Sequence, residues 1–203
     1  AYPTYLVGAL LAQAQAFSVE LDPTTWKQAD LAWVNSPSNP TGRVHTESEL
    51  RAAINWARAH GSVVVSDECY FEFGDSAQPT SILKFTDGDN RKILAVHSLS
   101  KRSSMAGYRA AFVIGDPELI SKILEVRKHA GMIVPLPVQR AMVTALSDSD
   151  HVVQQRDRYN ARRAILRPAL EAAGFIIEDS VAGLYIWATR DRKSTRLNSS
   201  HTV

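Results

Sequence analysis

The chain has 203 residues, of which 45% are hydrophobic and 22% charged, a composition typical of a globular protein with one large domain or slightly more. It contains no uninterrupted apolar run long enough to cross a bilayer and shows no signal-peptide pattern, although it begins at Ala1 and a preceding segment could carry either. The net charge of +2 is too small to favour a nucleic-acid or membrane surface, and the single cysteine, Cys69, excludes an internal disulfide and suits a reducing compartment.

The N-terminal part of the sequence predicts a helix and two strands. Residues 5–16 are rich in Ala and Leu, which favours a helix, and residues 17–21 alternate as in a short strand. The apolar run at 31–34 predicts a second strand. The loop that follows it, residues 35–42, is composed of Ser, Pro, Asn, Thr and Gly.

A capping box marks the next helix. Thr46 and Glu49 have the required spacing, and Gly61 ends the helical pattern just after His60. The β-branched run at 63–65 is short and continuous, which is typical of a parallel strand covered on both faces. Similar apolar runs at 93–96 and 110–114 predict two further strands.

Helices dominate the remaining residues. Asp116 and Pro117 suit the N-cap and first position of a helix. Further helices are predicted at 136–147 and at 150–173, where Gly174 ends the second, and strands at 175–178 and 184–188.

The order of these elements divides the chain. Strands and helices alternate up to residue 130, which predicts an α/β domain with a largely parallel sheet over 1–149. The long helix followed by strands predicts the beginning of a smaller α+β domain over 150–192. Residues 193–203 are polar, lack periodicity and resemble a translated sequencing-adaptor tail, although a genuine disordered tail is the alternative. Without Lys193 and Arg196 the chain has 21 basic and 21 acidic residues.

Polar residues follow three of the predicted strands. Asn39 comes after the strand at 31–34, Asp67 after the strand at 63–65, and Ser98 and Lys101 after the strand at 93–96. Ligands bind outside the carboxyl ends of the strands in open parallel sheets. We therefore expect these separate stretches to form one site.

The residue types at this edge suit pyridoxal phosphate (PLP). A neutral Lys101 amine can form a Schiff base with an aldehyde, and Asp67 can keep a pyridine nitrogen protonated. Tyr70 and Asn39 can donate hydrogen bonds to the phenolate oxygen of the cofactor. Arg109 offers a planar fork for a phosphate, and Ser98 and Ser100 add hydroxyl donors.

Each residue also has an ordinary structural interpretation. A lone lysine is usually a solvated surface residue, an aspartate at a strand end is often an N-cap, and a tyrosine is often part of the core. The combination of residue types, their order and their strand-end positions favours the PLP site. The histidines show no metal-ligand spacing, so we expect no metal.

The sequence resembles the fold-type I PLP enzymes, and within them the class I/II aminotransferases, from Tyr2 to about Ala188. The residues that carry the resemblance are Asn39-Pro40-Thr41-Gly42, Ser66-Asp67-Glu68-Cys69-Tyr70, Ser98-Leu99-Ser100-Lys101 and Gly107-Tyr108-Arg109. The resemblance implies a PLP-dependent transferase-like three-layer α/β/α large domain with a mostly parallel sheet, plus the start of a small α+β domain.

The resemblance also implies residue roles. Lys101 would form the Schiff base and transfer the proton, Asp67 would pair with the pyridinium, and Asn39 and Tyr70 would contact the phenolate oxygen. Tyr2 would stack on the ring, with Tyr5 as the nearby alternative. The bond before Pro40 would be cis, and the residues that hold the phosphate would be Ser98, Ser100 and Arg109.

The loop around Lys101 is most similar to that of actinobacterial succinyldiaminopimelate transaminases. This similarity implies a cytoplasmic homodimer that transfers an amino group from glutamate to a 2-oxo acid in lysine biosynthesis. The N-terminal phosphate-contacting loop and the arginine that binds the substrate carboxylate would lie outside the chain. We therefore expect the 203-residue chain alone to be poorly folded or inactive.

Two other functions share the same residues. Another fold-type I enzyme, such as a C–S β-lyase, would need the whole cofactor site. An aminotransferase-like sensor domain of a transcription regulator would also need it, and would carry a winged-helix segment before Ala1.

Overall fold

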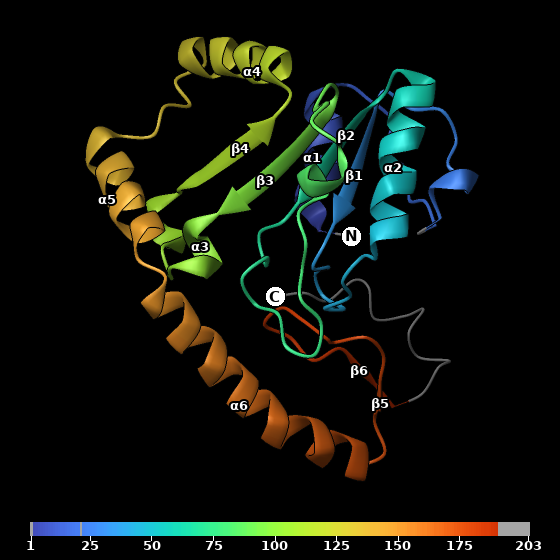
Figure 1. Cartoon of the computed structure of the whole chain (residues 1–203), viewed down its shortest axis with the longest axis vertical. Helices are drawn as coiled ribbons and strands as arrows, with labels where there is room; N and C mark the ends of the chain where they lie inside the picture. The colour runs from blue at the N-terminus through green and yellow to red at the C-terminus, as the bar shows by residue number, and fades with distance from the viewer. Residues whose placement is uncertain (1, 21, 191–203) are drawn as a thin grey trace.

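A four-stranded sheet forms the centre of the structure, a computed structural model that describes residues 2–20 and 22–190 (Figure 1). The first three strands are parallel and the fourth is antiparallel to the third, in the spatial order β1-β2-β3-β4. The mostly parallel α/β sheet predicted from the sequence is confirmed. The strands are β1 (Leu31–Asn35), β2 (Val63–Asp67), β3 (Ile93–Ser98) and β4 (Ala111–Gly115).

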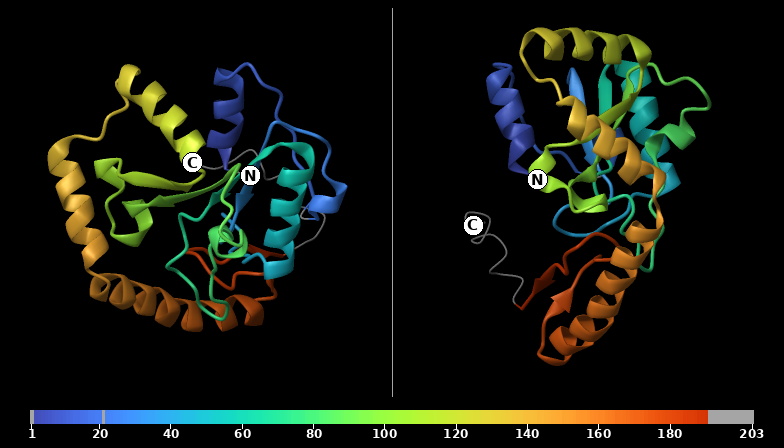
Figure 2. Two further views of the ribbon diagram at one scale, coloured as in Figure 1. Left: turned by 45° about the horizontal axis from the view of Figure 1, so that its top comes forward. Right: turned by 90° about the vertical axis from the view of Figure 1, so that its left-hand side faces the viewer.

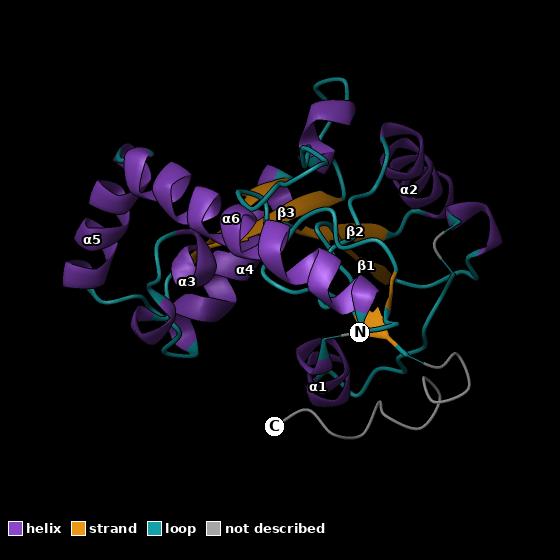
Figure 3. Ribbon diagram, turned by 90° about the horizontal axis from the view of Figure 1, so that it is seen from below, coloured by secondary structure: helices purple, strands orange, loops and turns teal. Residues whose placement is uncertain are grey.

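The sheet is central because its inner strand β2 is apolar on both faces. Val64 and Val65 of β2 are both buried, at 0% and 4% exposure, which confirms the coverage predicted from the β-branched run. Trp33 of β1 stacks on Tyr5 of α1 (Pro3–Leu11), whereas its neighbour Val34 belongs to the core on the other face. Figure 3 shows α1 and α2 on opposite sides of the strands.

Helix α2 (Glu47–His60) provides more of the main core than any other element. Its capping box is formed as predicted, with Thr46 accepting from the Glu49 amide, and Gly61 ends it in the left-handed conformation at φ +65°. Its apolar face packs against β2 and against the 3-10 turns at Pro23–Thr25 and Ile82–Phe85. The buried residues of the helix are Leu50, Ala53, Ile54, Trp56 and Ala57.

The N-terminal segment differs from the prediction. Helix α1 ends at Leu11 rather than at residue 16, and Gln13 has a positive φ of 54°. Residues 17–20 form no strand, and Leu21 lies outside the described residues. A strand needs a neighbouring ladder, and Phe17 and Val19 are exposed without one. The alternation of residue types at 17–21 was therefore insufficient to predict a strand.

Helices follow one another around the outside of the sheet after β4 (Figure 2). Asp116 caps α4 (Pro117–His129) by accepting hydrogen bonds from the amides of Glu118 and Leu119, as predicted. Neither α4 nor α5 (Leu136–Ser147) buries a residue in the described structure, and their exposed apolar side chains include Val126 and Val143. Among the described residues, no helix could cross a membrane. The remaining helices and turns are α3 (Leu99–Arg102), α4 (Pro117–His129), α5 (Leu136–Ser147), α6 (Asp150–Ala172), Pro23–Thr25 and Ala106–Tyr108.

The C-terminal segment returns to the sheet. Strands β5 (Ile176–Ile177) and β6 (Ala188–Thr189) pair antiparallel. β5 is shorter than the predicted strand at 175–178. The predicted strand at 184–188 is wrong except at its last residue, because residues 184–187 form no strand. Arg163 of α6 is 6% exposed and donates hydrogen bonds to the carbonyls of Ser180, Gly183 and Tyr185. These bonds fix residues 180–185 as a docking loop.

The docking loop contacts the turn after β1 by backbone bonds. The Ser180 amide donates to Thr41 O at 2.7 Å, and the Ala182 amide donates to Gly42 O at 3.0 Å. The Gly183 amide donates to Phe73 O at 2.8 Å. The segment after residue 150 is thereby joined to the loops at the sheet edge. The domain boundaries at 149 and 192 stay predictions, and the predicted tail at 193–203 lies outside the described residues.

Gly42 is required at this contact. Its φ is +71°, and an added Cβ would lie 2.3 Å from the carbonyl oxygen of Ala182. We expect Gly42→Ala to lower the free energy of unfolding by about 1–3 kcal/mol, measured by urea denaturation. The matched control is Gly88→Ala, because Gly88 has φ +85° but open space around its Cα. Equal losses in the two variants would show that the contact is unimportant.

Candidate active site

The carboxyl ends of β1, β2 and β3 meet at one edge of the sheet. Asn35, the last residue of β1, is in register with Asp67, the last residue of β2, and Asp67 is in register with Val96 of β3. The turn carrying Lys101 begins directly after β3. The predicted strand-end positions of Asp67 and Lys101 are therefore the ones that the structure has.

Asn35 joins the predicted Asn39 loop to β2. Its side-chain amide donates to Asp67 O at 3.1 Å and to Pro37 O at 3.2 Å, and its Oδ1 accepts from the Asn39 amide at 2.7 Å. The peptide bonds before Pro37 and Pro40 are both cis, and that before Pro40 was expected from the family resemblance. Sequence reasoning missed Asn35, although an amide side chain at a strand end, four residues before another Asn, was a usable signal.

Asp67 accepts hydrogen bonds on both carboxylate oxygens. Tyr5 Oη donates to Oδ2 at 2.5 Å, and the Cys69 amide donates to Oδ1 at 3.1 Å. Burial, followed by the bond to Asp67, raises the pKa of the Tyr5 phenol, so this phenol remains a donor. Burial and then the Asp67 charge raise the pKa of the Cys69 thiol, which therefore stays protonated.

Tyr70 lies beside the Asn39 amide. Asn39 Nδ2 donates to Tyr70 Oη at 3.4 Å, a long bond that links the β1 loop to the turn after β2. The Tyr185 ring of the docking loop is edge-on to Tyr70, with ring centroids 6.1 Å apart. Burial, followed by the Tyr185 hydroxyl, raises the pKa of the Tyr70 phenol, so Tyr70 remains protonated at neutral pH.

Lys101 lies in the single turn of α3. Ser98 is the N-cap of this turn, and its Oγ accepts from the Ser100 amide at 3.1 Å. Lys101 is half-buried, and its charge opposes the rise in the pKa of the Cys69 thiol beside Asp67. Ser98, Ser100 and Lys101 therefore lie at or just after the end of β3, at the edge of the sheet where β2 ends with Asp67.

Arg109 and Tyr2 lie at the periphery of the described structure. Arg109 has a left-handed backbone at φ +54°, and its exposed guanidinium donates to Ala106 O at 2.9 Å. This single bond leaves most of the five donors of the fork for an anion. Tyr2 is 49% exposed, and its ring is 6.0 Å from that of Tyr5. Tyr5 reaches Asp67, so the two tyrosines occupy different positions at the site.

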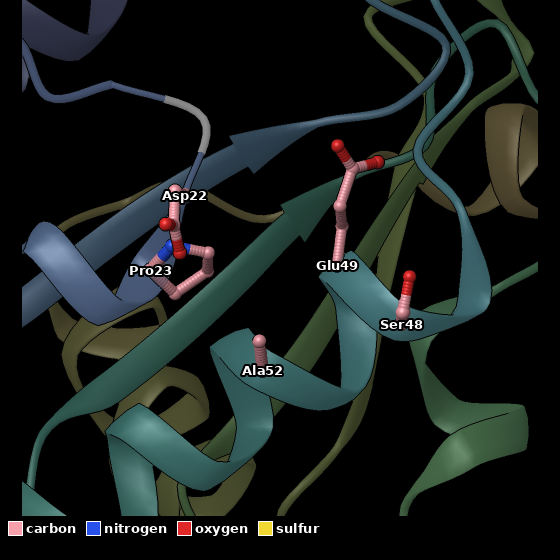
Figure 4. Close-up of a pocket in the computed structure, with 5 residues that line it drawn as sticks. All are labelled: Asp22, Pro23, Ser48, Glu49 and Ala52. Atoms are coloured by element: carbon pink, nitrogen blue, oxygen red, sulfur yellow. The ribbon is translucent and has the colours of Figure 1, made fainter.

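Two hollows in the described surface lie away from most of these residues. One, of about 380 Å³, is lined by Ser48, Glu49 and Ala52 of α2 and by Asp22 and Pro23 (Figure 4). A second, of about 290 Å³, has Ser98 and Arg102 on its wall together with Glu68 and His97. His97 Nε2 lies 3.0 Å from the buried Glu68 carboxylate, and its ring stacks on Phe112. These contacts are those of a structural histidine.

A model of the aminotransferase class I and II family matches residues 8–200. The chain belongs to this family. The match includes the edge residues Asn39, Asp67, Tyr70 and Lys101, and it extends into the predicted tail. The family resemblance inferred from the sequence motifs is therefore confirmed.

Two curated relatives are more than half identical to this aminotransferase chain. "Probable aminotransferase Rv1178" of Mycobacterium tuberculosis is 55% identical over 94% of the chain and 46% of the relative. "4-dedimethylamino-4-oxo-anhydrotetracycline transaminase OxyQ" of Streptomyces rimosus is 52% identical over 94% of the chain and 54% of the relative. The chain thus spans about half the length of these relatives.

Solved aminotransferase structures have the same fold. The substrate-bound BacF structure from Bacillus subtilis superposes with a TM-score of 0.82 at 28% identity, covering 92% of this chain and 51% of that one. N-succinyldiaminopimelate aminotransferase from Mycobacterium tuberculosis gives a TM-score of 0.79 at 27% identity, covering 90% and 51%. These comparisons confirm the α/β aminotransferase fold predicted from the sequence.

Proposed function

We propose that this chain carries the cofactor side of a PLP-dependent aminotransferase that acts as a cytoplasmic homodimer. The observation that supports this most strongly is the convergence of Asn39, Asp67, Tyr70 and the Lys101 turn on one edge of the sheet. Asn39, Tyr70 and Lys101 lie on three separate loops or turns, and Asp67 is at a strand end. The carboxylate, the phenol and the amine of this set each have a use in PLP chemistry.

The donor set fits PLP. Asp67 already accepts two hydrogen bonds, but a carboxylate has capacity for about four, so it can also accept from a protonated pyridine nitrogen. Tyr70 keeps its phenolic proton and Asn39 has a side-chain amide, and both can donate to the ring oxygen. Ser98, Ser100 and Arg109 are donors for the phosphate, and Tyr2 is the ring-stacking candidate.

When bound, PLP supplies an aldehyde that condenses with amines and a ring that accepts the electron pair left by a departing proton. Lys101 would supply the amine that holds the aldehyde and that takes up the proton from the substrate α-carbon. Asp67, held by Tyr5 Oη and the Cys69 amide, would accept a hydrogen bond from the pyridine nitrogen. The amino donor and the 2-oxo acid would use these same residues in turn, in a ping-pong cycle.

For the substrates, we propose glutamate as donor and N-succinyl-2-amino-6-oxopimelate as acceptor, the succinyldiaminopimelate transaminase reaction of lysine biosynthesis. The motif around Lys101 and the solved relative of that name support this choice. The relative OxyQ, whose name specifies a tetracycline ketone, supports a cyclic ketone as the competing acceptor.

The proposal is tested with purified full-length protein. We expect a visible absorption band from bound PLP, which glutamate alone should convert stoichiometrically while releasing 2-oxoglutarate. The succinylated acceptor should then regenerate the band faster than an oxo-tetracycline. Faster regeneration by the ketone would replace the proposed acceptor.

Two outcomes would replace the proposed reaction itself. Pyruvate and ammonia formed continuously from cystathionine, with no need for a 2-oxo acid, would indicate a C–S β-lyase. A visible band that no amino donor converts would favour a sensor domain.

A further inference from the structure

A chain of side chains links the Lys101 turn to the junction of α5 and α6. Ser103 is the C-cap of α3, two residues after Lys101, and its Oγ lies 3.0 Å from His151 Nε2. The other ring nitrogen of His151, Nδ1, lies 2.8 Å from Asp148 Oδ2. Ser103, His151 and Asp148 form a serine–histidine–aspartate chain, which we call the junction chain.

The direction of the hydrogen bonds follows from the ends of the junction chain. Asp148 has a carboxylate that can only accept, so His151 Nδ1 must carry the proton. In the neutral imidazole, Nε2 is then an acceptor, and Ser103 Oγ donates to it. Ser103 Oγ can in turn accept from Arg102 Nη1, which lies 3.2 Å away. Both ring nitrogens of His151 and the Ser103 hydroxyl have partners in this arrangement.

Arg102 provides a second connection from the same turn. Its Nη1 donates to Ala145 O at 2.7 Å, close to the end of α5, and its Nε lies 3.4 Å from Glu72. The Arg102 side chain is 12% exposed. Together with the junction chain, these bonds fix both residues that follow Lys101, so the turn is joined to α5 and α6 on its C-terminal side.

We propose that His151 is a positioning residue for Lys101 and acts through the Ser103 hydroxyl. The amides of Ser103 and Met105 both donate to Leu99 O, at 3.0 and 3.2 Å, and these bonds close the turn around Lys101. Ser103 Oγ held by His151 keeps the turn closed. The amine of Lys101 is thereby presented from a rigid backbone, which a proton-transferring group requires. This role of Lys101 rests on the proposed function.

Amide hydrogen exchange in the full-length protein without cofactor tests the positioning directly. In Ser103→Ala and in His151→Asn, we expect exchange at the Ser103 and Met105 amides to accelerate by about fivefold or more. Asparagine retains a donor for Asp148 but is too short to reach Ser103. The double variant should exchange no faster than either single variant, because both remove the same bond. Ser103→Thr, which keeps the hydroxyl, should behave as the original protein.

The matched control is His129→Ala. His129 on α4 also pairs with a carboxylate, at 2.8 Å from Glu125, but it is exposed and has no connection to Lys101 in the described structure. Exchange in Ser103→Ala and His151→Asn equal to that in His129→Ala would overturn the proposal. Acceleration spread evenly over β1, β2 and β3 would also overturn it, since that reports general destabilisation.

A second measurement uses the protein loaded with PLP. We expect the pH midpoint of the visible absorption band to shift in Ser103→Ala and His151→Asn and to return in Ser103→Thr, because the band reports the surroundings of the Lys101 nitrogen. An unchanged midpoint in both variants would overturn the effect on Lys101. A protein without any visible band would contradict the proposed function alone, because the exchange experiment needs no cofactor.

Discussion

Replacing Lys101 with alanine should reduce amino-group transfer by the full-length protein by about four orders of magnitude. Under the proposed function, the variant loses both the amine that would form the covalent link and the base that would remove the α-proton. Asp67, Tyr70 and Asn39 are unaffected, so PLP should still bind, without a covalent bond. The turn itself should persist, because its backbone bonds to Leu99 do not involve the Lys101 side chain.

Borohydride reduction followed by peptide mass spectrometry provides the measurement. The original protein should yield a reduced cofactor adduct on the peptide containing Lys101, and Lys101→Ala should yield none. Lys122→Ala is the control, because Lys122 is an exposed residue of α4 that pairs only with Glu118 in the described structure, and it should keep adduct and activity. An adduct that persists on another lysine in Lys101→Ala would assign the link elsewhere.

Replacing Arg163 with alanine should destabilise the protein by about 3–5 kcal/mol. Arg163 is buried, and its removal leaves the carbonyls of the docking loop without their donors and Asp75 without its cation, which lies 3.4 Å away. Burial lowers the pKa of the guanidinium, and the Asp75 charge opposes that shift. Lysine should not restore stability, because it lacks the planar fork whose separate nitrogens bond the three carbonyls.

The control for Arg163 is its neighbour in α6. Arg162 is exposed, and its guanidinium lies over the Tyr159 ring at 5.6 Å. Arg162→Ala should cost no more than about 1 kcal/mol. Urea denaturation of the full-length variants measures both values. A loss in Arg163→Ala no larger than that in Arg162→Ala would show that the docking loop is held by its backbone bonds alone.

Local sequence signals were sufficient for much of the fold. The capping box at Thr46 and the cap at Asp116 involve residues within three positions, so their chemistry is legible in the sequence. The continuous β-branched run at 63–65 has apolar side chains on both faces, so it predicted a strand that is buried on both faces. The predicted strand at 17–21 failed because pairing depends on a partner that alternation does not specify.

The site was predictable at strand ends and not beyond them. Parallel strands bring Asp67 and Lys101 to one edge once their order is known. Tyr5 is 62 residues from Asp67, and its hydrogen bond depends on how α1 lies against Trp33. The contacts of Tyr185 and Arg163 could not be predicted, because they depend on the return of the docking loop to the turn at Gly42. No periodicity or motif encodes such a return.

The contact between the docking loop and the Thr41–Gly42 turn has a consequence during synthesis. Ser180 and Thr41 are 139 residues apart, and a ribosome adding about 5–20 residues per second needs roughly 7–28 s to connect them. Throughout that interval the turn bearing Asn39 is made but has no covering loop. A nascent chain can therefore form the sheet early, yet it acquires the surroundings of Tyr70 only when translation has passed Tyr185.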